Sequence, residues 1–232
     1  MPNWCDNMVT LRHDDKAKID ALDEEMSKKN AALHFEGQLL QHLVPNPSGE
    51  WDYNWSVENW GTKWDVSIID CERRGDNEFW ISFESAWSPP TVAYDTLVEQ
   101  GWEIDAVYYE PGMGFGGVYD SGNGGDDYYE YDISNPESIK DLPLELIEFG
   151  DLETKAYEYM IEEMEDEWVD AKRTAWHSVD VKPEYDGYYE LQVKGYGDSL
   201  DEQFCEFKNG EWDRWNLENV IAWRGLAEDP SK

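Results

Sequence analysis

The order of short apolar runs along the first 110 residues limits the fold more than any other feature of this sequence. Four strand-like patterns and two helical patterns alternate, and they fall at 8–12, 14–29, 64–73, 78–85, 91–100 and 102–109. The order strand, helix, strand, strand, helix, strand is the split β-α-β arrangement of ferredoxin-like domains. Both helices are then expected on one face of the sheet, so the opposite face must be covered or used.

Two further segments belong to this first domain. Residues 33–55 contain Pro45, Pro47 and Gly49 and are expected to form a long ordered insertion. The runs FGGVYD and YYEYDI flank the glycine-rich SGNGGDD, a pattern typical of a final hairpin.

The pattern changes after Pro136. Residues 144–175 are predicted to be helical, with one apolar stripe at a spacing of four: Leu152, Ala156, Met160, Met164 and Trp168. From Trp176 onward short strands return, with a turn at Asn209-Gly210. The predicted class is α+β, with a ferredoxin-like domain at 1–135, an acidic helical connector at 136–175 and a small β-rich domain at 176–232.

Charge narrows the choice of partners. The chain has 53 acidic and 18 basic residues, a formal net charge of −35. Such a field repels phosphates and anionic membranes and attracts cations or basic proteins, so direct nucleic-acid or membrane binding is not expected. Three distant cysteines and no apolar run of about 20 residues predict a cytoplasmic protein with reduced thiols.

Four separated motifs carry a resemblance to a known family. MPNWCDN at the start, NWGTKWD at 59–65, FESAWSPP at 83–90 and YYEPGMGFGG at 108–117 occur in the order found in the YubB ferredoxin-like family. That family consists of proteins of bacteriophages, prophages and conjugative plasmids, so the resemblance implies a mobile element and a bacterial host. The C-terminal segment from Trp176 is similar to a small phage-associated family, although Ala227 replaces the proline of its final motif.

The tryptophans of these motifs are expected to meet at one end of the sheet, where three loops converge. The group comprises Trp4, Asn59, Trp60, Lys63, Trp64 and Trp87. In one interpretation it is a packed aromatic plug whose indole N–H groups donate to loop carbonyls. In the other it is a shallow ligand or peptide site that uses Lys63.

No motif predicts catalysis, a cofactor or a metal. The four histidines are scattered without i, i+4 spacing, and no nucleophile motif is present. The glycines of GMGFGG do not lead into a helix, so they predict a bulge or a strand that passes close over a side chain. We therefore expect no catalytic residues, no metal ligands and no cofactor.

Acidic residues are densest in the connector. Between Glu103 and Asp170 there are 21 acidic residues and two lysines. The proposed partner-binding face within the helix expected at 151–170 comprises Asp151, Glu158, Glu162, Glu163, Asp166, Glu167 and Asp170. Nine acidic residues lie along about 30 Å of this helix. Their average spacing is therefore close to the spacing of roughly 3.4 Å between successive phosphates of a DNA strand. The acidic face either keeps the helix exposed to solvent and the protein soluble, or it mimics DNA.

Three functions follow as hypotheses. The first is a non-enzymatic accessory protein that binds, and inhibits, a basic nucleic-acid-handling host protein of the defence or restriction type, by DNA mimicry. The second is a small-molecule or nucleotide-handling enzyme that uses the tryptophan-lined end of the sheet. The third is a scaffold whose acidity serves only solubility.

Overall fold

The computed structural model describes residues 3–28, 38–169, 174–194, 200–212 and 219–225. These residues form a mixed α+β protein with two antiparallel sheets and six α-helices. The elements follow in the order β1 (Trp4–Arg12), α1 (Lys16–Met26), α2 (Leu39–Leu43), α3 (Tyr53–Trp60), β2 (Ser67–Arg73), β3 (Glu78–Ala86), α4 (Thr91–Glu99), β4 (Glu103–Glu110), β5 (Phe115–Asp120), β6 (Gly125–Glu130), a 3₁₀ turn η1 (Pro136–Ser138), α5 (Leu144–Gly150), α6 (Leu152–Val169), β7 (His177–Ser178), β8 (Gly187–Lys194), β9 (Leu200–Lys208), β10 (Glu211–Trp212) and β11 (Val220–Arg224).

The first sheet has the strand order β2-β3-β1-β4-β5-β6. Strand β1 lies in its centre, where Val9 is opposite Ile81 of β3 and Ala106 of β4. Burial alternates along β1, because successive side chains of a strand point to opposite faces of the sheet. The strands and helices predicted between residues 8 and 109 are all present, within a few residues of the expected bounds.

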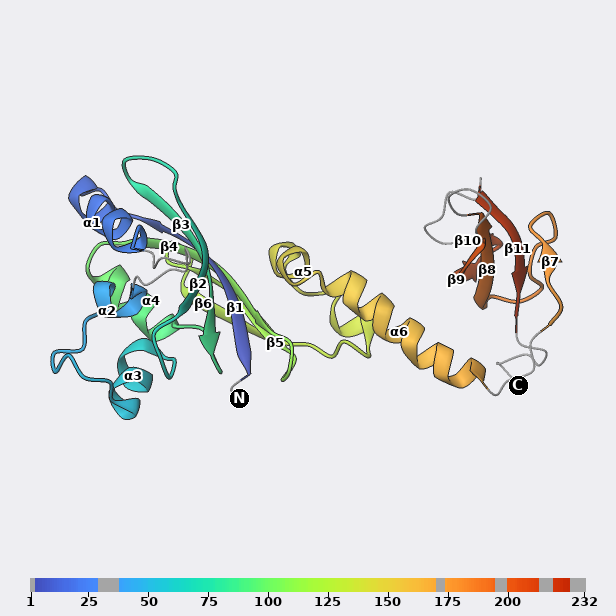
Figure 1. The fold of residues 1–232 in the computed structure, drawn as a ribbon, viewed down its shortest axis with the longest axis horizontal. Coiled ribbons are helices and arrows are strands. Elements are labelled where there is room, and N and C mark those ends of the chain that lie inside the picture. Colours follow the sequence, from blue (N-terminus) through green and yellow to red (C-terminus); the bar gives the residue numbers. More distant parts are fainter. Residues whose placement is uncertain (1–2, 29–37, 170–173, 195–199, 213–218, 226–232) are drawn as a thin grey trace. The chain divides into compact units, whose positions relative to one another are not determined.

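Helices α1, α2, α3 and α4 cover one face of this sheet (Figure 1). Helix α1 begins where the Asp15 carboxylate accepts a hydrogen bond from the Ala17 N–H, 3.0 Å away. Its buried residues Ile19, Leu22 and Met26 pack with the inward side chains of β1 and β3 in the main core. The insertion predicted at 33–55 contains α2 and the start of α3, and its residues 33–37 lie outside the described residues.

Within the described part of the chain, the opposite face is covered at one side, by residues that follow β6. Leu146 of α5 and Leu152 of α6 are fully buried against Val107 of β4 and the partly buried Val118 of β5. Figure 1 shows α5 on the side of the sheet away from α1 and α4. The second face of the sheet was expected to be covered or used. One part of it is covered by these residues and the other part is open.

The prediction of one continuous helix at 144–175 is wrong, because the helix is interrupted at Asp151 and residues 174 and 175 are not helical. Asp151 adopts a left-handed conformation with φ of 48°, which ends α5 and separates it from α6. The break allows both Leu146 and Leu152 to reach the same face of the sheet. Helical periodicity continues on both sides of it, so the apolar pattern does not reveal the interruption. In the stripe predicted here, Leu152 and Ala156 are buried and Met160 is partly exposed, while the side chains of Met164 and Trp168 lie outside the described residues.

The glycines of β5 allow close packing, as predicted for the GMGFGG motif. A Cβ atom at Gly116 would lie 2.7 Å from Leu146 Cδ1, and one at Gly117 would lie 2.5 Å from the Tyr108 ring carbon Cζ. Side chains on both faces of the sheet thus pass over this strand at distances that only glycine permits.

The chain divides into two compact units, residues 1–156 and 157–232. The division falls within α6. The second unit contains a five-stranded sheet with the order β10-β9-β8-β11-β7 and a small core that includes Leu191 and Trp223. Its β9–β10 hairpin turns at Asn209 and Gly210, whose φ values of 54° and 83° suit the predicted two-residue turn. No helix within the described ranges has the length and apolar character needed to cross a membrane.

Candidate functional site

The tryptophan-lined end of the sheet is built around α3. The Asp52 carboxylate begins this helix by accepting a hydrogen bond from the Trp55 N–H at 2.8 Å, and Gly61 ends it with φ of 84°. A Cβ atom at Gly61 would lie 3.1 Å from Val92 Cγ2 and 3.4 Å from the Pro89 carbonyl oxygen. Glycine therefore supplies both the left-handed conformation and the space that lets α3 approach the start of α4.

The four tryptophans of the predicted group do not form a single plug. Trp60 is buried in the main core, where its indole N–H donates to the Val44 carbonyl at 2.8 Å. The rings of Trp4 and Trp64 meet with their centroids 6.4 Å apart. Trp87 is instead 54% exposed.

The two polar members of the group lie close to these rings. The Lys63 ammonium is 4.2 Å from the centroid of the Trp64 ring, a cation–π distance. The Asn59 amide donates to the Trp55 carbonyl at 2.8 Å, within α3 itself. Asn59 is therefore used to support the helix, whereas Lys63 orders an aromatic ring.

Trp87 has an unusual backbone conformation. Its φ is 77°, a region that costs a bulky residue about 1–3 kcal/mol. The backbone is held there by a hydrogen bond from the Trp87 N–H to the Asn3 carbonyl at 3.0 Å. Burial does not offset this cost, because more than half of the side chain faces solvent.

A pocket of about 340 Å³ lies beside Trp87. It is lined by Tyr53, Val57, Gly61, Thr62, Lys63, Ala86, Trp87 and Ser88. The hydroxyls of Thr62 and Ser88 donate to the Ala86 and Gly61 carbonyls at 2.9 and 2.6 Å, so they already hold the wall together. The remaining lining is mainly apolar and aromatic, which is the usual composition of a binding pocket.

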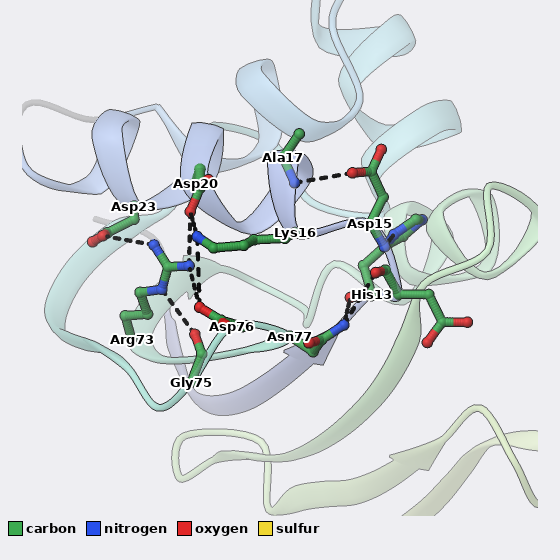
Figure 2. Close-up of polar contacts among 11 residues, drawn as sticks. His13, Asp15, Lys16, Ala17, Asp20, Asp23, Arg73, Gly75, Asp76 and Asn77 are labelled. Carbon is green, nitrogen blue, oxygen red and sulfur yellow. Dashed lines mark hydrogen bonds and ion pairs between the residues drawn. The ribbon is translucent and has the colours of Figure 1, made fainter.

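A second polar cluster, shown in Figure 2, joins α1 to the turn between β2 and β3. Arg73 reaches the carboxylates of Asp20 at 2.7 Å and Asp23 at 3.5 Å, and Lys16 also pairs with Asp20. Hydrogen bonds from Lys16 and then Arg73 hold the pKa of Asp20 below its ordinary value. The arrangement satisfies its own charges, so we assign it a structural role.

The acidic face predicted on α6 is present in the part that the structure describes. Asp151, Glu158, Glu162 and Glu163 are exposed, although Asp151 precedes the helix instead of belonging to it. The side chains of Asp166 and Glu167, and all of Asp170, lie outside the described residues. Lys155 points its ammonium at the Tyr109 hydroxyl, 2.8 Å away, and does not neutralise this face.

The open part of the sheet is a second acidic surface, which the sequence reasoning missed. Across β1, β2, β3 and β4, the register places seven carboxylates on the face shared by Thr10 and Trp80: Asp6, Asp70, Glu72, Glu78, Glu84, Glu103 and Asp105. Arg12 pairs with Glu78 and Asp105, and Arg74 pairs with Glu72 at 3.2 Å. The other four form no ion pair with any cation in the described part of the chain. Acidic residues at alternate positions of these strands could have indicated this surface. The cross-strand register is needed, however, to show that they share one face.

Asp126 is among the carboxyl groups whose pKa is displaced without a basic neighbour. Asp126 of β6 accepts a hydrogen bond from the Tyr108 hydroxyl at 2.8 Å. Loss of water around this carboxyl raises its pKa above the ordinary value, and the charges of Asp127 and Asp95 act in the same direction. Among the described residues, no group of three or more His, Cys, Asp or Glu side chains is arranged to hold a metal ion.

Comparison with known families, curated proteins and solved structures yields no match to this chain.

Proposed function

We propose that this chain is a non-enzymatic binding protein that docks through its carboxylates onto a basic, nucleic-acid-handling protein. The observation that carries the proposal is the exposed acidic face of α6, where Glu158 and Glu162 have no ion-pair partner among the described residues. Unpaired carboxylates at this density create a field that steers and binds basic partners.

A host protein of the defence or restriction type is the proposed target, and DNA mimicry the proposed mode. Support comes from the resemblance of four motifs to a family of mobile-element proteins. The order β2-β3-β1-β4, with helices after β1 and after β3, also supports the ferredoxin-like architecture that this family implies. Strands β5 and β6 would then be an extension of that sheet.

The test uses a matched pair of charge-reversal variants. One carries Glu158→Lys, Glu162→Lys and Glu163→Lys on α6. The other carries Asp14→Lys, Glu24→Lys and Glu99→Lys, which are exposed residues of the first unit and are not part of α6. Each variant has a net charge of −29 instead of −35, so a change in overall charge affects both equally.

A partner is first captured from bacterial lysate and identified, and its affinity is then measured with purified proteins. We expect the α6 variant to lose binding and the control variant to keep it. Wild-type binding should weaken steeply between about 50 and 500 mM salt, because screening shortens the range of charge interactions. Duplex DNA should compete for the same partner. Equal affinity of the α6 variant and the wild type, or no competition by DNA, would show that this face does not mimic DNA.

A further inference from the structure

The acidic surfaces do not explain the pocket beside Trp87 or the exposed apolar residues around its opening. Tyr53 and Val57 lie one turn apart on α3 and are 51% and 40% exposed. Together with Trp87 they present an apolar and aromatic surface around the opening of a pocket of about 340 Å³. Exposed aromatic residues around a pocket are typical of the energetic centre of a protein–protein interface.

Asp52 and Glu58 flank the α3 segment on which Tyr53 and Val57 lie, as their direct chain neighbours, and we call these two carboxylates the acidic rim. Both residues are exposed, and Glu58 has no ion-pair partner among the residues that the structure describes. The nearby cation, Lys63, holds its ammonium over the Trp64 ring. The rim therefore favours an occupant with positive charge on either side of an apolar group.

We propose that the pocket receives one apolar side chain of a basic polypeptide, whose flanking arginine or lysine side chains lie against the acidic rim. The volume supports this size of group, since it is near the lower end of the range for ligand pockets, roughly 300–1,000 Å³. The strained and exposed Trp87 forms a wall onto which the side chain packs. The inference rests on the proposed function for the basic character of the partner, and it adds where and how that partner is held.

The probes are three capped pentapeptides added to the full-length protein. The sequence Arg-Gly-Leu-Gly-Arg tests the proposed occupant, Arg-Gly-Ser-Gly-Arg removes its apolar group, and Glu-Gly-Leu-Gly-Glu reverses its charge. Binding is followed through the indole N–H signals in ¹⁵N NMR spectra, where Trp87 is assigned from the spectrum of Trp87→Ala.

We expect the arginine–leucine peptide to shift the Trp87 signal in a saturable manner, with a dissociation constant in the millimolar range. The serine peptide should bind about tenfold more weakly, which corresponds to about 1.4 kcal/mol. The glutamate peptide should not bind. Stronger binding of the glutamate peptide, or no shift of Trp87 by the arginine–leucine peptide at several millimolar, overturns the proposal.

Two variants separate a binding role of Trp87 from a structural one. Trp87→Gly suits the positive φ, so it should fold at least as well as the wild type and lose peptide binding. Tyr128→Ala removes a side chain with the same 54% exposure on β6 and should leave peptide binding unchanged. Unchanged binding in Trp87→Gly would overturn the proposal.

The α6 charge-reversal variant distinguishes this inference from the proposed function. It should bind the arginine–leucine peptide like the wild type, even when it no longer binds the protein partner. If Trp87→Gly keeps full affinity for the identified partner while the α6 variant loses it, the pocket inference fails and the proposed function stands. If the peptide binds as expected but the α6 variant keeps the partner, the acidic-face proposal fails alone.

Discussion

Trp60 and Trp87 are the same residue type in two neighbouring motifs, yet they lie in opposite environments. Trp60 is 4% exposed and has a satisfied indole N–H, whereas Trp87 is 54% exposed on a strained backbone. Trp60 belongs to the main core and packs its ring against Trp55 of the same helix, whereas Trp87 is not a member of that core. The free energy that each ring contributes to folding must therefore differ.

We expect Trp60→Ala to lower the free energy of unfolding by about 3–5 kcal/mol, because it removes a large buried ring and leaves a cavity. Urea unfolding followed by circular dichroism measures this change. Trp87→Ala is the matched control and should change stability by less than about 1 kcal/mol, since little burial is lost. Similar losses in both variants would mean that Trp87 packs as a core residue in solution.

Asp126 predicts a pH dependence of stability. Because its pKa is raised in the folded state, the fold favours the protonated carboxyl, and this contribution is present at acid pH and lost as the pH rises through the folded-state pKa. Asp126→Asn keeps an oxygen that accepts from the Tyr108 hydroxyl and removes the charge. Its melting temperature should exceed that of the wild type at pH 7, and the difference should shrink toward pH of about 4. Asp14→Asn removes an exposed charge that does not act on Asp126 and serves as the control, and an identical gain there would attribute the effect to net charge alone.

At the scale of elements, strand β5 depends on glycine because side chains from other elements pass directly over it. Gly117→Ala would bring a methyl group to 2.5 Å from Tyr108 Cζ and 2.6 Å from the Asp127 carbonyl oxygen. We expect a loss of about 1–3 kcal/mol in unfolding free energy, as is usual for overpacking. Gly75→Ala is the control, since a Cβ atom there meets nothing within 4 Å. Equal urea midpoints for the two variants would contradict this account of β5.

At the scale of the whole molecule, the second face of the first sheet is completed by residues that composition assigned to a connector. Ile139, Leu142, Leu146, Leu152 and Ala156 are all buried in one cluster with Val107 of β4. The acidic segment is thus apolar on one side, and its residues up to Ala156 belong to the first unit. The exposed Glu158, Glu162 and Glu163, which are proposed to bind a partner, follow this boundary in the chain.

This arrangement predicts the outcome of two truncations. A fragment of residues 1–160 should melt cooperatively, whereas a fragment of residues 1–135 should bind a hydrophobic dye and melt early or without cooperativity. The reason is that Val107, Tyr109 and Val118 lose their cover when residues 139–156 are absent. Thermal unfolding followed by calorimetry compares the two. A fragment 1–135 that is as stable as 1–160 would support the domain boundary predicted from the sequence and contradict this account.

The sequence by itself determined the elements whose signals are local. The alternation of β1, the capped start of α1 at Asp15 and the turn at Asn209-Gly210 are set by the pleat, by a single side-chain acceptor and by positive φ values. The acidic face on α6 was likewise readable, because helical spacing and charge are both sequence properties.

Only the tertiary structure decided what depends on contacts distant in sequence. Helical periodicity continues across Asp151, so the break between α5 and α6 is explained by Leu146 and Leu152 packing on one sheet face. The acidic surface of the open sheet required the register of β2, β3, β1 and β4. The burial of Trp60 and the exposure of Trp87 required the packing of α3 against α4. In each case the conformation is stabilised by contacts between groups that are distant in sequence and that the fold brings together. A local sequence pattern contains no information on these contacts.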